Sequence, residues 1–142
     1  MTVAVDAMGG DSPLSIQLEG AVRAANELGI EVVLVGHETQ IKDRLKNMPH
    51  SENKVRIVHC EEMVEMHESP SQALRQKKDS SIRVAMDLHK RGEVDAVVSA
   101  GNTGAAMATA KFVLKSIPKI DRPAIATLMP STQRNSPFVI LD

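Results

Sequence analysis

The sequence has 142 residues, a length typical of one ordinary domain, and a hydrophobic content of 42% is enough for a buried core. The formal net charge of −1 and the presence of only two aromatic residues, both Phe, argue against a protein that binds nucleic acid by charge or by base stacking. No long apolar stretch follows a basic start, so the sequence predicts neither a signal peptide nor a transmembrane helix.

The first part of the chain alternates short β-branched runs with stretches of helical periodicity. Residues 3–5 indicate a buried strand, and the polar segment 6–11 follows it directly. A helix is expected next, in which Ser12 is the N-cap, Pro13 lies in the first turn and Gly29 follows the last turn. The apolar stripe of this helix consists of Leu14, Leu18, Ala21, Val22, Ala25 and Leu28.

The same alternation continues along the chain. Further strands are predicted at residues 31–36, 55–59, 94–98, 124–129 and 138–141. Further helices are predicted at residues 41–48, from Ser69 onward, at residues 82–90 with Asp79 or Ser80 as cap, and at residues 105–115. Because strands and helices alternate for most of the length, we expect an α/β fold with a mostly parallel, doubly wound sheet and helices on both faces.

The last two strands break this pattern. Only the polar turn 131–136 connects them, which is too short for a parallel crossover, so they should pair antiparallel or lie apart in the sheet. The apolar run 137–141 indicates a buried strand that ends in an acid, Asp142, and a loop that carries function is expected after such a strand. We therefore expect residues 1–142 to be the N-terminal α/β portion of a longer protein, truncated after Asp142.

The candidate site centres on the segment Ser-Ala-Gly-Asn-Thr-Gly at residues 99–104, between a predicted strand and a predicted helix. This arrangement directs backbone N–H groups at an anion, and ligands in open α/β sheets bind outside the carboxyl ends of the strands. The segment lacks the Gly-Lys-Ser/Thr ending of a Walker A loop and is no Gly-x-Gly-x-x-Gly fingerprint. It predicts a phosphate or acyl-phosphate site, and the alternative is a tight turn whose glycine serves helix–strand packing. The candidate ligand groups belong to Ser99, Gly101, Asn102, Thr103 and Gly104.

The polar segment after the first strand is a second candidate. Gly9 and Gly10 suit a tight turn, and Asp6 and Asp11 could orient a donor or bind a cation. The alternative is that Asp11 or Ser12 simply caps the following helix.

A third candidate is the run that contains Lys77, Lys78 and Ser80. Two lysines beside a serine-rich helix start would attract and hold an oxyanion, whereas the alternative is a surface basic pair followed by an N-cap.

Other chemistry-bearing residues give weaker signals. Cys60, the only cysteine, follows a predicted strand and is expected in the core or at its edge rather than as a nucleophile. His59 is the one histidine placed for base catalysis, and the alternative is a partly buried structural histidine. The segment 61–68 carries four glutamates without compact ligand spacing, so a solvated acidic segment is preferred to a metal site.

Several of these motifs, in this order, resemble the bacterial phosphate acyltransferases of phospholipid synthesis, the PlsX family. The matching segments are residues 6–11, 68–70, 73–75, 77–81, 99–105 and 121–126. The resemblance implies a fold similar to the phosphotransacetylase and isocitrate dehydrogenase-like group. It also implies transfer of a fatty acyl group from acyl carrier protein to inorganic phosphate, giving acyl phosphate for the first acylation of glycerol 3-phosphate. Further implications are a cytoplasmic homodimer associated peripherally with the membrane, and no metal or organic cofactor.

The sequence departs from this family at two points. Family members extend well past Asp142, through a membrane-contacting hairpin and the dimer region, so residues 1–142 alone are expected to lack activity. Ser12 stands where many members have histidine.

Within this resemblance, Asn102 and Lys78 are the candidate catalytic residues. The N–H groups of residues 101–104 and the side chains of Asn102 and Thr103 would hold phosphate or the oxyanion, and Lys78, with Lys77, would neutralise its charge. Asp6 and Asp11 would orient the glycine loop, and no acyl-enzyme is needed because phosphate itself attacks. The alternatives are a non-catalytic phosphate-binding or assembly module and a phosphotransacetylase that uses short acyl-coenzyme A.

Overall fold

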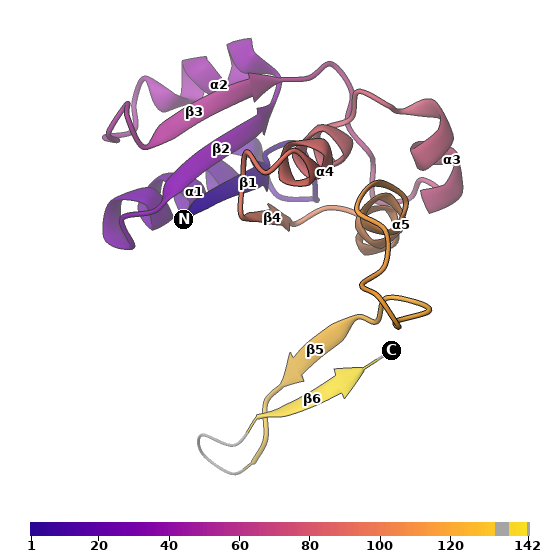
Figure 1. Cartoon of the computed structure of the whole chain (residues 1–142). Helices are drawn as coiled ribbons and strands as arrows, with labels where there is room; N and C mark the ends of the chain where they lie inside the picture. Colours follow the sequence, from indigo (N-terminus) through magenta and orange to yellow (C-terminus); the bar gives the residue numbers. More distant parts are fainter. Residues whose placement is uncertain (133–136, 142) are drawn as a thin grey trace.

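Four of the predicted strands form one parallel sheet in the computed structural model, which describes residues 1–132 and 137–141. The strand order is β3-β2-β1-β4 (Figure 1). The strands are β1 (Thr2–Asp6), β2 (Glu31–Gly36), β3 (Val55–His59) and β4 (Ala96–Ser99). Because β1 lies in the middle and pairs in parallel with β2 and β4, the loops that follow β1 and β4 leave the same edge of the sheet side by side.

Helices cover both faces of this sheet. They are α1 (Leu14–Glu27), α2 (Glu38–Leu45), α3 (Pro70–Gln76), α4 (Ser81–Lys90) and α5 (Thr103–Val113). Val32 and Leu34 of β2 pack with α1 and α2, while Val33 and Val35 of the same strand pack with α4. Alternate residues of one strand thus enter two different cores, which explains the continuous apolar run and confirms the doubly wound α/β prediction.

The helix ends correct three sequence predictions. Ser12 does not cap α1: Pro13 takes the N-cap position, and no side chain bonds to the first turn. Leu28 lies beyond the helix and is 72% exposed, so it is not part of the apolar stripe. Ser80 does occupy the N-cap position of α4, but its side chain makes no capping bond. Gly29 follows α1 at a φ of +68°, as predicted for a C′ glycine.

The last two strands form a separate antiparallel hairpin, β5 (Ala126–Met129) with β6 (Phe138–Leu141), away from the parallel sheet (Figure 1). The predicted antiparallel pairing is confirmed. The predicted burial of residues 138–141 is wrong, because among the described residues the two strands pair only with each other and all eight are exposed. The predicted polar turn falls in part on residues 133–136, which lie outside the described residues.

Strand β4 is also less buried than predicted. It lies at the edge of the sheet. Helix α1 covers β1 and β2 on one face of the sheet, but Val98 of β4 on that face is 54% exposed. A cleft of about 330 Å³ runs there between α1 and the edge of the sheet, with Val98, Val5 and Ile16 among its lining residues. None of the helices described is long and apolar enough to span a bilayer.

One glycine inside α1 and one just after its end allow a matched test of where the helix ends. Gly29→Ala should lower the free energy of unfolding by about 1 kcal/mol, because alanine is strained at this positive φ. Gly20→Ala, inside α1 with open space around its Cα, should raise it by about 0.5–1 kcal/mol. Urea unfolding of both variants checks this, and equal signs for the two changes would contradict the assigned end of α1.

Candidate functional site

The loops after β1 and β4 touch each other through glycine backbone. A Cβ added to Gly9 would lie 3.0 Å from the Cα of Gly101, and one added to Gly101 would lie 3.1 Å from the Cα of Gly9. Gly10 has a φ of +96°, and a Cβ there would lie 2.7 Å from the carbonyl oxygen of Ala100. Only hydrogen at these positions lets the two loops pack so closely, so the structure brings the first and second candidate segments together.

Asp6 lies beneath both loops. Its side chain, in a residue that is 3% exposed, accepts a hydrogen bond of 2.7 Å from the Oγ of Ser99, the residue opposite it in the ladder. The Ser99 Oγ in turn accepts a bond of 3.1 Å from the N–H of Gly101, and Asp6 Oδ1 accepts one of 3.3 Å from Met8 N. Since Ser99 uses its only proton on Asp6, both side chains fix the loop backbone in this geometry and are not free for a ligand.

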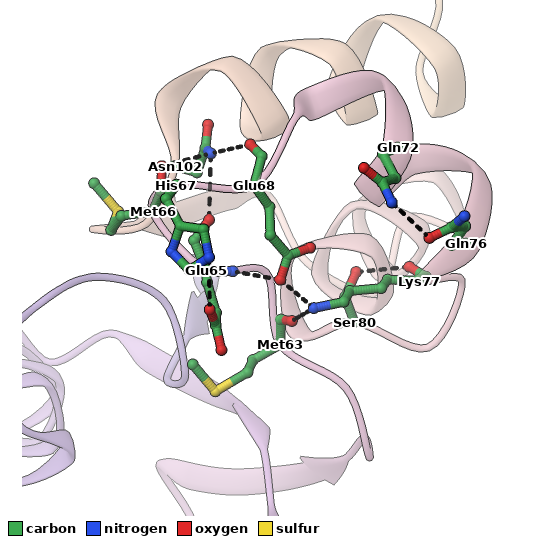
Figure 2. Close-up of polar contacts among 10 residues, drawn as sticks. All are labelled: Met63, Glu65, Met66, His67, Glu68, Gln72, Gln76, Lys77, Ser80 and Asn102. Atoms are coloured by element: carbon green, nitrogen blue, oxygen red, sulfur yellow. Dashed lines mark hydrogen bonds and ion pairs between the residues drawn. The ribbon is translucent and has the colours of Figure 1, made fainter.

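Asn102 joins the start of α5 to the segment that follows β3. Its Oδ1 accepts from Ala105 N at 3.0 Å, which makes it the N-cap of α5. Its Nδ2 lies 3.3, 3.1 and 3.0 Å from the carbonyl oxygens of Glu65, Met66 and Glu68 (Figure 2). Sequence reasoning proposed this amide as a ligand donor, but here its hydrogen-bonding groups are all occupied within the protein.

Two N–H groups at the start of α5 remain open. Within the described part of the chain, the N–H groups of Thr103 and Gly104 have no acceptor, and Thr103 is exposed. The Oδ1 of Asn102 accepts from the next N–H group along the helix, that of Ala105. The N–H groups of Thr103 and Gly104 are therefore left pointing out of the positive end of the helix. The glycine at 104 serves packing, because a Cβ there would lie 2.8 Å from Pro70 Cγ in α3. The contact is thus helix with helix rather than the helix–strand packing considered from the sequence.

The two lysines of the third candidate segment differ in environment. Lys77 Nζ donates 2.7 Å to the carbonyl oxygen of Met63 and forms an ion pair with Glu68 (Figure 2). The hydrogen bond from Lys77 lowers the pKa of the Glu68 carboxyl below its ordinary value. Lys78 is exposed and forms no hydrogen bond or ion pair with any described residue. Ser80 is 1% exposed and donates to the carbonyl oxygen of Lys77, so its hydroxyl is out of reach of a ligand.

A pocket of about 220 Å³ lies between Gly10 and Asp11 on one side and residues 63–67 on the other. Asp11 is exposed and unpaired among the described residues, and Glu65 adds a second carboxyl group that pairs with His67 at 3.3 Å. The lining contains no Lys or Arg. Sequence reasoning missed residues 63–67 as part of the site. Their signal, methionines between glutamates, is common in solvated segments and gives no hint of a pocket.

His59 and Cys60 are structural residues. His59 Nε2 pairs with Glu61 at 2.7 Å, and its Nδ1 accepts from Glu38 N at 3.2 Å, so both ring nitrogens are engaged. Cys60 is 1% exposed, and burial, with Asp79 and Asp6 nearby, raises the pKa of its thiol to about 12. The core position predicted for Cys60 is therefore confirmed. No group of three potential metal-binding side chains occurs within residues 1–132 and 137–141.

The fold and these loops define a doubly wound α/β protein whose glycine loops meet beside an open helix N-terminus. The chain matches the family described as "Fatty acid synthesis protein" over residues 1–142, and it belongs to this family. It is 51% identical over 142 residues to the phosphate acyltransferase of Syntrophotalea carbinolica and 50% identical over 142 residues to that of Dictyoglomus turgidum. It is 53% identical over 131 residues to the phosphate acyltransferase of Geobacter sulfurreducens.

These alignments cover 100%, 100% and 92% of this chain and 40%, 42% and 38% of the respective relatives. The chain thus spans about two fifths of the length of the relatives it matches, from their N-terminal side. The resemblance inferred from the motifs is confirmed.

Two substitutions at Asn102 should separate its two structural tasks. Asn102→Asp keeps an acceptor for Ala105 N but loses the donor to the three carbonyl oxygens, whereas Asn102→Ala loses both. Hydrogen exchange should therefore show faster exchange of residues 65–68 in both variants, and of the Ala105 amide only in Asn102→Ala. Equal protection of Ala105 in the two variants would contradict the assigned cap.

The buried thiol gives a chemical test of the fold. Iodoacetamide at pH 9 should leave Cys60 unmodified in the folded chain, because a pKa of about 12 keeps the thiol protonated and burial blocks access. The same reagent in urea concentrated enough to unfold the chain should modify it completely. Mass spectrometry measures both, and rapid modification of the folded chain would refute the core position.

Proposed function

We propose that this chain forms the N-terminal part of an enzyme that transfers a fatty acyl group from acyl carrier protein to inorganic phosphate, giving acyl phosphate for phospholipid synthesis. Family membership and about 50% identity to proteins named phosphate acyltransferase support the reaction class. The observation that carries the proposal in the structure is the open N-terminus of α5. Among the described residues, it offers two unpaired N–H groups beside a closely packed pair of glycine loops.

In the proposed reaction, an oxygen of phosphate attacks the carbonyl carbon of the thioester. A C–O bond forms, the tetrahedral intermediate collapses, and the C–S bond breaks. The leaving thiolate takes up the proton that the attacking hydrogen phosphate releases. The protein must therefore place phosphate beside the carbonyl and stabilise negative charge, and no acyl-enzyme is required.

We assign these tasks to three groups of residues. The N–H groups of Thr103 and Gly104, with the Thr103 hydroxyl, would hold phosphate or the oxyanion. Lys78, the lysine without a partner among the described residues, would neutralise charge, whereas Lys77 is already paired with Glu68. Asn102 would act by placing α5.

The loop residues support these groups from below. Asp6 and Ser99 hold the backbone of Gly101, and Gly9 and Gly10 allow the loops to meet. Asp11 would orient the first loop, and Ser80 supports the end of α3 through the carbonyl oxygen of Lys77.

The remaining properties are proposals that the family resemblance supports. They are a cytoplasmic location, a homodimer, peripheral association with the membrane, and action without a metal or organic cofactor. A second candidate function is phosphate binding without turnover by residues 1–142 alone. It is favoured by the length of the chain, which spans about two fifths of the relatives.

Thr103→Pro tests the anion site in the longer protein. Proline suits the first position of a helix and the extended backbone of Asn102, at φ −60° and ψ 107°, so the fold should persist while one N–H group and the hydroxyl are lost. Loss of such a donor should lower acyl-phosphate formation by about 100-fold. Thr103→Ala, which keeps the N–H group, should lower it less.

Two lysine variants accompany this test. Lys78→Ala should raise the KM for phosphate by about tenfold through the loss of one charge contact, and Lys90→Ala, an exposed position on α4, should leave the rate unchanged. A wild-type rate in Thr103→Pro would refute the site. Phosphate binding by residues 1–142 without turnover would support the second candidate for the chain alone.

A further inference from the structure

The pocket between Gly10–Asp11 and residues 63–67 does not suit a phosphate ion. Two of the lining residues carry carboxyl groups, Asp11 and Glu65, and none carries a Lys or Arg side chain. His67 also lines the pocket and pairs with Glu65 at 3.3 Å, so the unpaired carboxylate that a phosphate ion would face there is that of Asp11. Its remaining lining includes Met63, Val64 and Met66, and flexible methionine side chains adapt to apolar groups of varied shape.

Two of the residues that line the pocket also contact the start of α5. Glu65 and Met66, which line it, present their carbonyl oxygens to the Nδ2 of Asn102, the residue directly before Thr103. On the opposite side, Gly10 lies against Ala100 of the second glycine loop. A ligand in this pocket therefore lies next to an anion bound at Thr103 and Gly104, where a second substrate must be.

An ion pair and the amide of Asn102 hold the wall formed by residues 63–68 in place (Figure 2). Lys77 Nζ binds the carbonyl oxygen of Met63 at 2.7 Å and the carboxylate of Glu68, and the same carboxylate oxygen accepts from Glu65 N at 3.3 Å. The side chains of Lys77 and Glu68 are only 28% and 21% exposed, so solvent screens the pair less than a surface ion pair. Both ends of the wall, at Met63 and at Glu65–Glu68, thus depend on the ammonium group of Lys77.

We propose that this pocket takes the uncharged thioester end of the acyl donor, and that Lys77 is a positioning residue for that subsite rather than a ligand of phosphate. This inference rests on the proposed function, because it divides the two substrates of that reaction between two neighbouring places. Phosphate binds at the α5 N-terminus, and the acyl donor lies between the first glycine loop and the segment after β3.

The test is steady-state kinetics on the longer protein, with acyl-acyl carrier protein and inorganic phosphate varied separately. Lys77→Met keeps the length of the side chain but loses both contacts, so the KM for the acyl donor should rise by about tenfold while the KM for phosphate stays within about twofold. Lys77→Arg, which keeps the charge, should restore most of the loss. Lys90→Met on the surface of α4 is the matched control and should change neither constant.

Two further variants keep the test decisive if Lys77→Met fails to fold. Met66→Ala changes a side chain that is 43% exposed, and it should raise the KM for the acyl donor alone, by about threefold. Met63→Ala, at the other end of the same wall, should act in the same direction. A raised KM for phosphate with an unchanged KM for the acyl donor in Met66→Ala would overturn the inference, since it would place phosphate in the pocket.

The outcomes separate this inference from the proposed function. Equal changes of both KM values in Lys77→Met, or no change in either, would overturn the acyl-donor subsite while acyl-phosphate formation by the unmodified protein still stood. Failure to form acyl phosphate from these two substrates would instead overturn the proposed function.

Discussion

The contact between the backbones of Gly9 and Gly101 is the constraint on which the rest of the site depends. Two loops that leave adjacent parallel strands can meet at this distance only if neither carries a side chain at the point of contact. Asp6 holds the two loops in this position. Its carboxylate accepts a hydrogen bond from Ser99, and the Oγ of Ser99 accepts one from the N–H of Gly101. The position of the α5 N-terminus therefore depends on the loop after β1 as well as on β4, the strand that precedes α5.

The electrostatics of the site follow from which donors this arrangement uses. Asn102 and Ser99 satisfy the N–H groups of Ala105 and Gly101, whereas the N–H groups of Thr103 and Gly104 find no acceptor among the described residues and stay open at the positive end of the helix. The nearby lining residues Asp11 and Glu65 carry carboxyl groups. An anion is thus favoured at the helix end, and in the proposed reaction this contrast would place the two substrates at different positions.

The sequence predicts the sheet well because its signal is local. The run at residues 31–36 is apolar at successive positions since both faces of β2 are covered, and the glycine segments fall at strand ends as parallel topology requires. The wrong predictions from the sequence concern burial, which depends on residues distant in the chain. Val98 and residues 138–141 have the composition of buried strands, but no described element covers them. Burial depends on what packs against a strand, which a local pattern does not contain.

The candidate site shows the same limit at the level of single side chains. Asn102 has the chemistry of a ligand donor, yet its acceptors lie 34 to 37 residues earlier in the chain. Lys77 and Lys78 look equivalent in the sequence, but the backbone leaves the helical conformation at Lys77, with φ −101° and ψ 72°. Side chains on either side of such a turn diverge, so one ammonium group reaches Met63 and Glu68 and the other faces solvent. The chemical role of each lysine is therefore decided by the end of α3, and the basic pair acts as two separate charges rather than as one phosphate-binding patch.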